Sequence, residues 1–222
     1  MYRISYTTLT LFSQKTPTLV KGDKNMKPVI TLSREKGSGG RPIAHLLVRK
    51  LGPPWKVYHQ EIIEQIAREN DLAGWMAEEI DEHVISIVDE IVADILGSRY
   101  FSLDAYYRHL AKIIAAIGQR GHAVIIGRGA NFLLPHALKI RVICAMPQRI
   151  KWLMEFERIS REEAERRIDE SDSKRGEFIK ALYNHDQKKA HHYDLIVRTS
   201  EDVDIETAAD TVLCMARTRF AH

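Results

Sequence analysis

Five short apolar stretches, separated by segments with helical periodicity, set the pattern of this sequence. They occupy residues 29–32, 55–58, 123–127, 139–145 and 193–197 and are rich in β-branched side chains. Runs of this kind are typical of strands that are buried on both faces of a parallel sheet. Because the runs alternate with helical segments along the chain, the sequence predicts an α/β protein built on one central parallel sheet.

The intervening segments repeat apolar residues at three- and four-residue spacing, as amphipathic helices do. We expect helices near residues 42–51, 60–69, 75–96, 103–119, 147–156 and 205–215, and another that starts at Ser160. Ser160 followed by Glu163 is a capping box, which marks a helix start. The segment 75–96 has an unusually broad apolar face, which suits either core packing or a helix–helix contact in a homodimer.

The length of 222 residues is sufficient for one sizeable α/β domain with its own core. No internal repeat or low-complexity linker divides the chain, so we expect a single domain over residues 26–222. Residues 1–25 are basic and threonine-rich, but they lack the long apolar run and cleavage site of a signal peptide. We interpret them as a flexible N-terminal extension, with Met26 as a candidate start.

Composition excludes several classes of function. The formal net charge is only +3, and no basic strip with interleaved aromatic residues indicates a nucleic-acid partner. No stretch approaches the roughly 18 uncharged apolar residues that a membrane span requires. Cys144 and Cys214 lack metal-ligand spacing and are interpreted as free thiols, which predicts a reducing, cytoplasmic location.

The first strand leads into a glycine-rich loop, Gly37-Ser38-Gly39-Gly40, and then into a helix. Residues without a side chain allow an anionic ligand to approach the backbone N–H groups of such a loop. The helix start adds unpaired N–H donors and the positive end of the helix dipole. The succession of strand, glycine loop and helix favours a phosphate site over an ordinary turn.

The loop nevertheless departs from the Walker A pattern, G-x-x-x-x-G-K-[ST]. In one register Gly40 stands where the lysine should be, and Arg34 stands at the first glycine. In the other register Arg41 takes the lysine position, but Pro42 replaces the hydroxyl residue that holds Mg²⁺. Arg41 is therefore the candidate surrogate for the lysine, with Arg34 or Lys36 next in line.

The stretch I-T-L-S-R-E-K-G-S-G-G-R-P-I-A resembles the opening of the cytidylate kinase-like family, which typically reads S-R-E-x-G-S-G-G-R-x-I-A. This family is a divergent branch of the nucleoside monophosphate kinases among the P-loop NTPases, and the resemblance extends from Pro28 to about Ala216. It implies a three-layer P-loop kinase-like fold, with a central parallel sheet of about five strands, flanking helices and a helical lid. It also implies ATP and Mg²⁺ as cofactors, although no residue is assigned here as a metal ligand.

Arg128 follows the strand predicted at 123–127, within the sequence Gly127-Arg128-Gly129. Ligands of open α/β sheets bind beyond the carboxyl ends of the strands, so Arg128 should point into the same crevice as the glycine loop. A guanidinium suits bidentate recognition of phosphate. The resemblance assigns this arginine to the phosphate of the acceptor.

Residues 160–190 are highly charged, with a thin apolar stripe, and we expect either a solvated helical hairpin or a lid that apolar burial does not hold down. Asp172 and Arg175 lie three residues apart, hence on one helix face. They match the D-x-x-R of the family's lid. The resemblance implies that Asp172 contacts the nucleoside and that Arg175 contacts the phosphates.

The leading hypothesis is phosphoryl transfer from ATP to a nucleoside monophosphate, with CMP or dCMP as the expected acceptor. Residues Gly37, Ser38, Gly39, Gly40 and Arg41 would bind the ATP phosphates, Arg128, Asp172 and Arg175 the acceptor, and Arg41 and Arg175 would act in catalysis. Two alternatives stay open. The chain is a non-catalytic nucleotide-binding regulatory module, because the loop has neither the lysine nor the metal-binding Ser or Thr of the Walker A pattern, or it is a kinase for another small acceptor.

Overall fold

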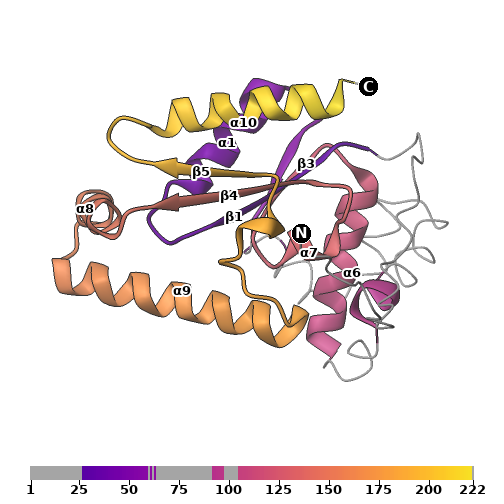
Figure 1. The fold of residues 1–222 in the computed structure, drawn as a ribbon, viewed down its shortest axis with the longest axis horizontal. Helices are drawn as coiled ribbons and strands as arrows, with labels where there is room; N and C mark the ends of the chain where they lie inside the picture. Colours follow the sequence, from indigo (N-terminus) through magenta and orange to yellow (C-terminus); the bar gives the residue numbers. More distant parts are fainter. Residues whose placement is uncertain (1–26, 60, 62, 64–91, 98–104, 222) are drawn as a thin grey trace, which may run out of the picture.

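The computed structural model describes residues 27–59, 61, 63, 92–97 and 105–221, and its centre is a sheet of five parallel strands (Figure 1). The strands are β1 (Val29–Arg34), β2 (Lys56–Tyr58), β3 (Ala123–Ile126), β4 (Leu138–Cys144) and β5 (Leu195–Thr199). Their order across the sheet is β2-β3-β1-β4-β5, and every neighbouring pair is parallel. The predicted parallel sheet is confirmed.

Helices cover both faces of the sheet, which makes three layers (Figure 1). The helices α1 (Gly40–Leu51) and α10 (Ile205–Phe220) lie on one face, and α6 (Ala105–Arg120) and α7 (Ala130–Leu133) on the other. Strand β3 shows why both faces are needed. Ala123 and Ile125 belong to the core under α6, whereas Val124 and Ile126 belong to the core under α1 and α10.

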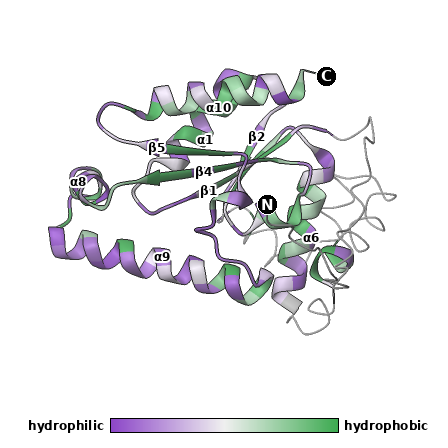
Figure 2. Cartoon of the chain, viewed as in Figure 1, coloured by the Kyte–Doolittle hydropathy of each residue, from purple (hydrophilic) through white to green (hydrophobic). Residues whose placement is uncertain are grey.

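Helix α8 (Met146–Glu157) lies beyond the carboxyl end of β4, and α9 (Arg161–Tyr183) starts there and runs back below the sheet toward α6 (Figure 1). The capping box is confirmed, because the Ser160 hydroxyl accepts a hydrogen bond from the Glu163 amide at 3.2 Å. Segment 160–190 is not a hairpin: residues 161–183 form one continuous helix. Figure 2 shows that hydrophilic residues dominate α9, in contrast to the strands.

Apolar burial holds both ends of α9, which corrects the expectation that it would not. Near its start, Ala164 and Ile168 pack with Ile150 and Leu153 of α8. Near its end, a second set of side chains enters the core below the sheet, namely Ile179, Leu182 and Tyr183. The charged middle of α9 therefore lies between two segments that are held by apolar packing.

Several expectations concern parts of the chain outside the described residues. These are the extension 1–25, nearly all of the helix at 60–69, and the greater part of the helix at 75–96 with its proposed dimer face. Residues 92–96 are helical, as predicted. None of the helices in the described part of the chain has the length and apolar character needed to cross a membrane.

Candidate functional site

The order of the strands places a crevice at the carboxyl ends of β1 and β4. From β1 the chain continues to β2 at one edge of the sheet, and from β4 it continues to β5 at the opposite edge. Ligands of open α/β sheets bind where neighbouring strands send their connections in opposite directions. The glycine loop follows β1 at this point, and α8 and α9 follow β4.

Protein neighbours, and not only a ligand, explain the glycines of the loop. Gly37 and Gly39 both have φ near +80°, a conformation that side chains disfavour. A Cβ atom at Gly37 would lie 2.6 Å from Leu153 Cδ1 of α8, and one at Gly39 would collide with Ile205 of α10. A Cβ atom at Gly40 would likewise lie only 2.7 Å from the Cβ of Arg34. The loop is thus packed tightly between β1, α8 and α10.

Ser38 anchors this loop to the sheet. Its side chain is fully buried, and its hydroxyl donates to the carbonyls of Glu35 at 2.9 Å and Val142 at 3.3 Å. The Thr199 hydroxyl of β5 donates in turn to the Ser38 carbonyl at 3.0 Å. Ser38 therefore faces the protein and does not line the cleft, unlike the other loop residues in the predicted phosphate site.

A cleft of about 750 Å³ runs along the loop, and Gly37, Gly39, Gly40 and Arg41 line it. The amide of Lys36 is already engaged, since it donates to Asp172 Oδ1 at 3.0 Å. Among the hydrogen bonds within the described residues, none uses the amides of Gly37, Gly39 or Gly40. These donors sit at the start of α1, where the helix dipole also favours an anion.

Arg41 lies at the rim of this cleft and is held by a carboxylate. Its Nη2 is 2.5 Å from Glu61 Oε1, and 56% of its side chain is exposed. His59 Nδ1 lies 2.6 Å from the other oxygen of Glu61. Burial alone would raise the pKa of Glu61, but the hydrogen bonds from Arg41 and His59 lower it to about 2. The proposed surrogate for the lysine is therefore partly neutralised where it stands.

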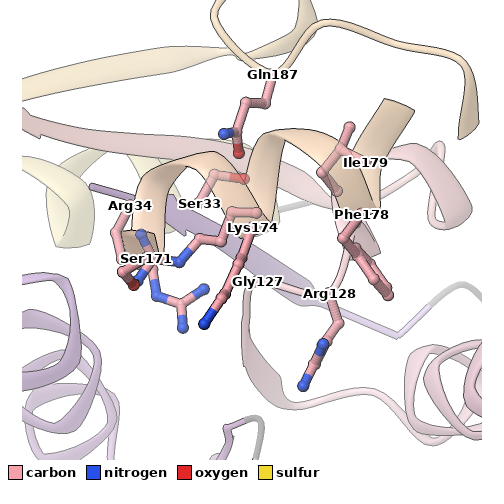
Figure 3. Close-up of a pocket in the computed structure, with 11 residues that line it drawn as sticks. Ser33, Arg34, Gly127, Arg128, Ser171, Lys174, Phe178, Ile179 and Gln187 are labelled. Atoms are coloured by element: carbon pink, nitrogen blue, oxygen red, sulfur yellow. The ribbon is translucent and has the colours of Figure 1, made fainter. Parts of the chain in front are cut away.

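A second cavity, of about 310 Å³, lies at the end of β3, where Figure 3 shows several cationic side chains around it. Arg128 lines it, as predicted, and has φ of 56° between Gly127 and Gly129, which also have positive φ. Two residues of α9 keep this turn in place. The Tyr183 hydroxyl donates to the Arg128 carbonyl at 3.1 Å, and Arg128 Cζ lies 5.2 Å from the centre of the Phe178 ring.

Arg34 is the functional candidate that the sequence ranked too low. It ends β1 and lines both the loop cleft and the β3 cavity, together with Ser171 and Arg175 of α9. Gly127 leaves room beside it, because a Cβ there would displace the Arg34 guanidinium. The available signal was the position of Arg34 at the carboxyl end of a central strand.

The arginines at this junction are partly buried and lie close enough to repel one another. Burial, and then the charges of Arg175, Arg128 and Arg41, lower the pKa of Arg34 to about 10. The pKa of Arg175 and that of Arg128 are also lowered, in each case mainly by burial. Half-buried cations that repel one another form a site that an anion stabilises, and a phosphate offers the matching geometry.

Asp172 lies outside both cavities and holds the site together. Its carboxylate accepts hydrogen bonds from Arg175 Nη1 at 2.6 Å, from the Lys36 amide and from Arg149 Nη2. Arg149 also donates from Nε to the Lys36 carbonyl at 2.6 Å. Asp172 thereby connects α9 to the glycine loop and orients Arg175, and it does not line the cavity at the end of β3 where Arg128 lies.

Each carboxylate among the described residues that line the loop cleft accepts a hydrogen bond from the protein. The four carboxylates that line it are all engaged, Glu61 with Arg41, Glu157 with Lys36, Glu35 with the Cys144 amide and Asp204 with the Thr207 amide. Within the described residues, no group of three or more His, Cys, Asp or Glu side chains is arranged to hold a metal. The part of the chain that the structure describes therefore offers no cluster that fits a protein-bound Mg²⁺.

Comparison with known proteins gives a family and a fold. The sequence model of the cytidylate kinase-like family matches residues 29–201. The crystal structure of an uncharacterized protein from Eubacterium ventriosum is similar, with a TM-score of 0.67 and 20% identity over 86% of this chain and 99% of that one. TT1252 from Thermus thermophilus and a shikimate kinase from Bacteroides thetaiotaomicron are more distant, with TM-scores of 0.46, identities of 18% and 14%, and coverage of 85% of this chain and 97% of theirs. No curated protein matches the chain.

Proposed function

Because this chain belongs to the cytidylate kinase-like family, we propose that it is a phosphotransferase that moves the terminal phosphoryl group of ATP to CMP or dCMP. Its sheet and flanking helices confirm the P-loop kinase-like fold that the sequence predicts. One observation carries the proposal: two adjoining cavities share Arg34, Ser171 and Arg175 in their walls. A donor and an acceptor bound in adjoining cavities can meet at that junction.

The donor phosphates bind along the glycine loop in this proposal. The amides of Gly37, Gly39 and Gly40 supply hydrogen bonds, and Ser38 contributes by holding the loop rather than by contact. Arg41 binds at the rim once the donor competes with Glu61 for its guanidinium. A Mg²⁺ ion would be held by the donor phosphates and its own waters, as such ions commonly are, and would supply positive charge there.

The acceptor phosphate binds in the β3 cavity, where Arg128 holds it. An ionised monophosphate attacks the terminal phosphorus of the donor in line, the bond to the leaving ADP oxygen breaks, and no protein base has to remove a proton. Catalysis of this kind depends on positioning and on neutralising charge. Arg34 and Arg175 supply that charge at the junction, and Asp172 positions Arg175.

The choice of CMP or dCMP as the acceptor rests on the family. In this proposal residues 26–222 form the single domain that carries the activity, and α9 is its lid. Both cysteines are free thiols, which supports a cytoplasmic location.

The second candidate is a non-catalytic module that binds nucleotides. It is favoured by the engaged carboxylates of the loop cleft and by the pairing of Arg41 with Glu61. A module of this kind retains donor binding at the loop amides but does not transfer the phosphoryl group.

The test is a coupled assay of ADP release with CMP, dCMP, UMP, AMP and GMP, with and without Mg²⁺. We expect release above the ATP-only background with CMP or dCMP, and loss of most of it in Arg175→Ala with ATP binding retained. ADP release with a different monophosphate would replace the acceptor. The absence of release with every monophosphate, alongside normal ATP binding, would favour the regulatory module.

A further inference from the structure

The lining of the loop cleft is chemically mixed. Cationic side chains and the loop glycines line one part of it, and an apolar group lines another, formed by Trp152, Leu153 and Phe156 of α8 and Ile205 of α10. Cavities that bind organic ligands commonly combine an apolar wall with a few placed polar groups. The phosphate chain of the donor would contact only the cationic part of this lining. The apolar part would then contact a different group of the ligand.

Helix α8 divides its apolar residues between two faces. Ile150 and Leu153 pack on α9 and form the buried core of that contact. Trp152 and Phe156 are four residues apart, hence neighbours on a different face, and both line the cleft. The Phe156 side chain is 77% exposed, the highest value among the large hydrophobic residues of the described chain that reach the surface.

The aromatic pair lies close to the phosphate loop. Leu153, adjacent to Trp152 in sequence, approaches so closely that a Cβ at Gly37 would be 2.6 Å from its Cδ1. Lys36 precedes the loop and Glu157 follows Phe156 in the sequence. Lys36 Nζ lies 2.7 Å from Glu157 Oε1. Ile205 of α10 also lines the cleft and lies against Gly39. A ligand whose phosphates contact the loop therefore brings its next group to Trp152 and Phe156.

We propose that Trp152 and Phe156 form a stacking platform for the nucleobase of the phosphoryl donor, an inference that rests on the proposed function for the phosphate end of the cleft. A planar heteroaromatic ring stacks on aromatic side chains through its π-face. Every base has such a face, so stacking discriminates little between bases. The platform makes this chain tolerant of the donor base, with ATP, GTP and CTP bound to a similar extent.

The experiment measures binding to the full chain by calorimetry, with ATP, GTP, CTP and inorganic tripolyphosphate as probes. Loss of one stacking contact should weaken each nucleotide by about 5- to 150-fold, while tripolyphosphate, which has no base, should bind Trp152→Ala and Phe156→Ala as it binds the wild type. Trp152→Phe keeps a ring and should retain most of the affinity. Met154→Ala is the matched control, because Met154 is a half-exposed residue of α8 outside the lining of either cavity.

Unchanged nucleotide affinity in both alanine variants would overturn the platform. Equal weakening of nucleotides and tripolyphosphate would also overturn it, because the substitutions would then act on the phosphate end. Discrimination of more than about tenfold between the three triphosphates would refute the expected tolerance. Because all of these are binding measurements, they are separate from the ADP-release assay, whose failure would reject phosphoryl transfer and leave the platform in place.

Discussion

The replacement of Asp172 by alanine tests the ionic network that joins α9 to the glycine loop. The side chain removed accepts hydrogen bonds from Arg175, Arg149 and the Lys36 amide. Arg149 is nearly buried, with 6% of its side chain exposed, whereas Asp172 and Arg175 are 28% and 23% exposed. The variant therefore leaves one nearly buried guanidinium without its closest carboxylate.

The expected cost follows from these exposures. Breaking a fully buried ion pair by removing one partner costs about 3–5 kcal/mol. Here the carboxylate is partly solvated, and Arg149 retains its hydrogen bond to the Lys36 carbonyl, so we expect about 2–3 kcal/mol. For a domain of this size that corresponds to a decrease in Tm of roughly 4–12 °C. Asp172→Asn keeps an acceptor oxygen and should lose about half as much.

Urea and thermal unfolding measure the change, with Glu170→Ala as the matched control. Glu170 lies on the same helix and pairs with Arg166 at 2.5 Å on the surface, where ion pairs contribute little to stability. In the kinetic assay, Asp172→Asn should lower kcat more than it raises KM for ATP, because Arg175 loses its orientation. A loss of stability in Asp172→Ala no larger than in Glu170→Ala would refute the network.

Three further outcomes are expected. Arg34→Ala should lower kcat by about 10²-fold. Arg41→Ala should lower kcat by less than about tenfold, because Glu61 already holds that guanidinium. Steady-state kinetics distinguishes the two variants, and a larger loss in Arg41→Ala would restore Arg41 as the main cation. Gly39→Val should destabilise the fold by about 2–4 kcal/mol in urea unfolding, through its positive φ and its collision with Ile205, whereas an unchanged midpoint would contradict the packing. Folding lowers the pKa of Glu61 from 4.5 to about 2, so its contribution to stability is present above pH 4.5 and is lost as the pH falls from 4.5 toward 2. Glu61→Gln should therefore flatten that part of the acid-unfolding curve by less than about 1 kcal/mol. An identical curve would show that the pair adds nothing to stability.

Local patterns were sufficient to locate the strands and the two turns of the site. The apolar runs of β1 and β3 are recognisable because both faces of a central strand are buried, so consecutive side chains must be apolar. The turns at Gly37 and Gly127 follow directly, since a glycine after such a run marks the end of the strand. Arg128 was predictable for the same reason: its position after β3 sends it to the carboxyl edge of the sheet.

Helix α9 was predictable in part. The capping box at Ser160 gave its start, because that signal is contained within four residues. Its continuity and its anchoring were missed. The side chains of Ile168 and Ile179 are too sparse for a periodic pattern, and they are buried only because α8 and the core below the sheet lie against opposite ends of the helix.

The sequence by itself determined which segments become strands and helices and which turns carry glycine, because these depend on neighbours a few residues away. Only the tertiary structure decided which charges meet. Arg34, Arg128 and Arg175 come from three different elements and converge at one junction, and Asp172 finds the Lys36 amide across 136 positions. Such contacts depend on how the sheet and helices pack, and no local propensity encodes that packing.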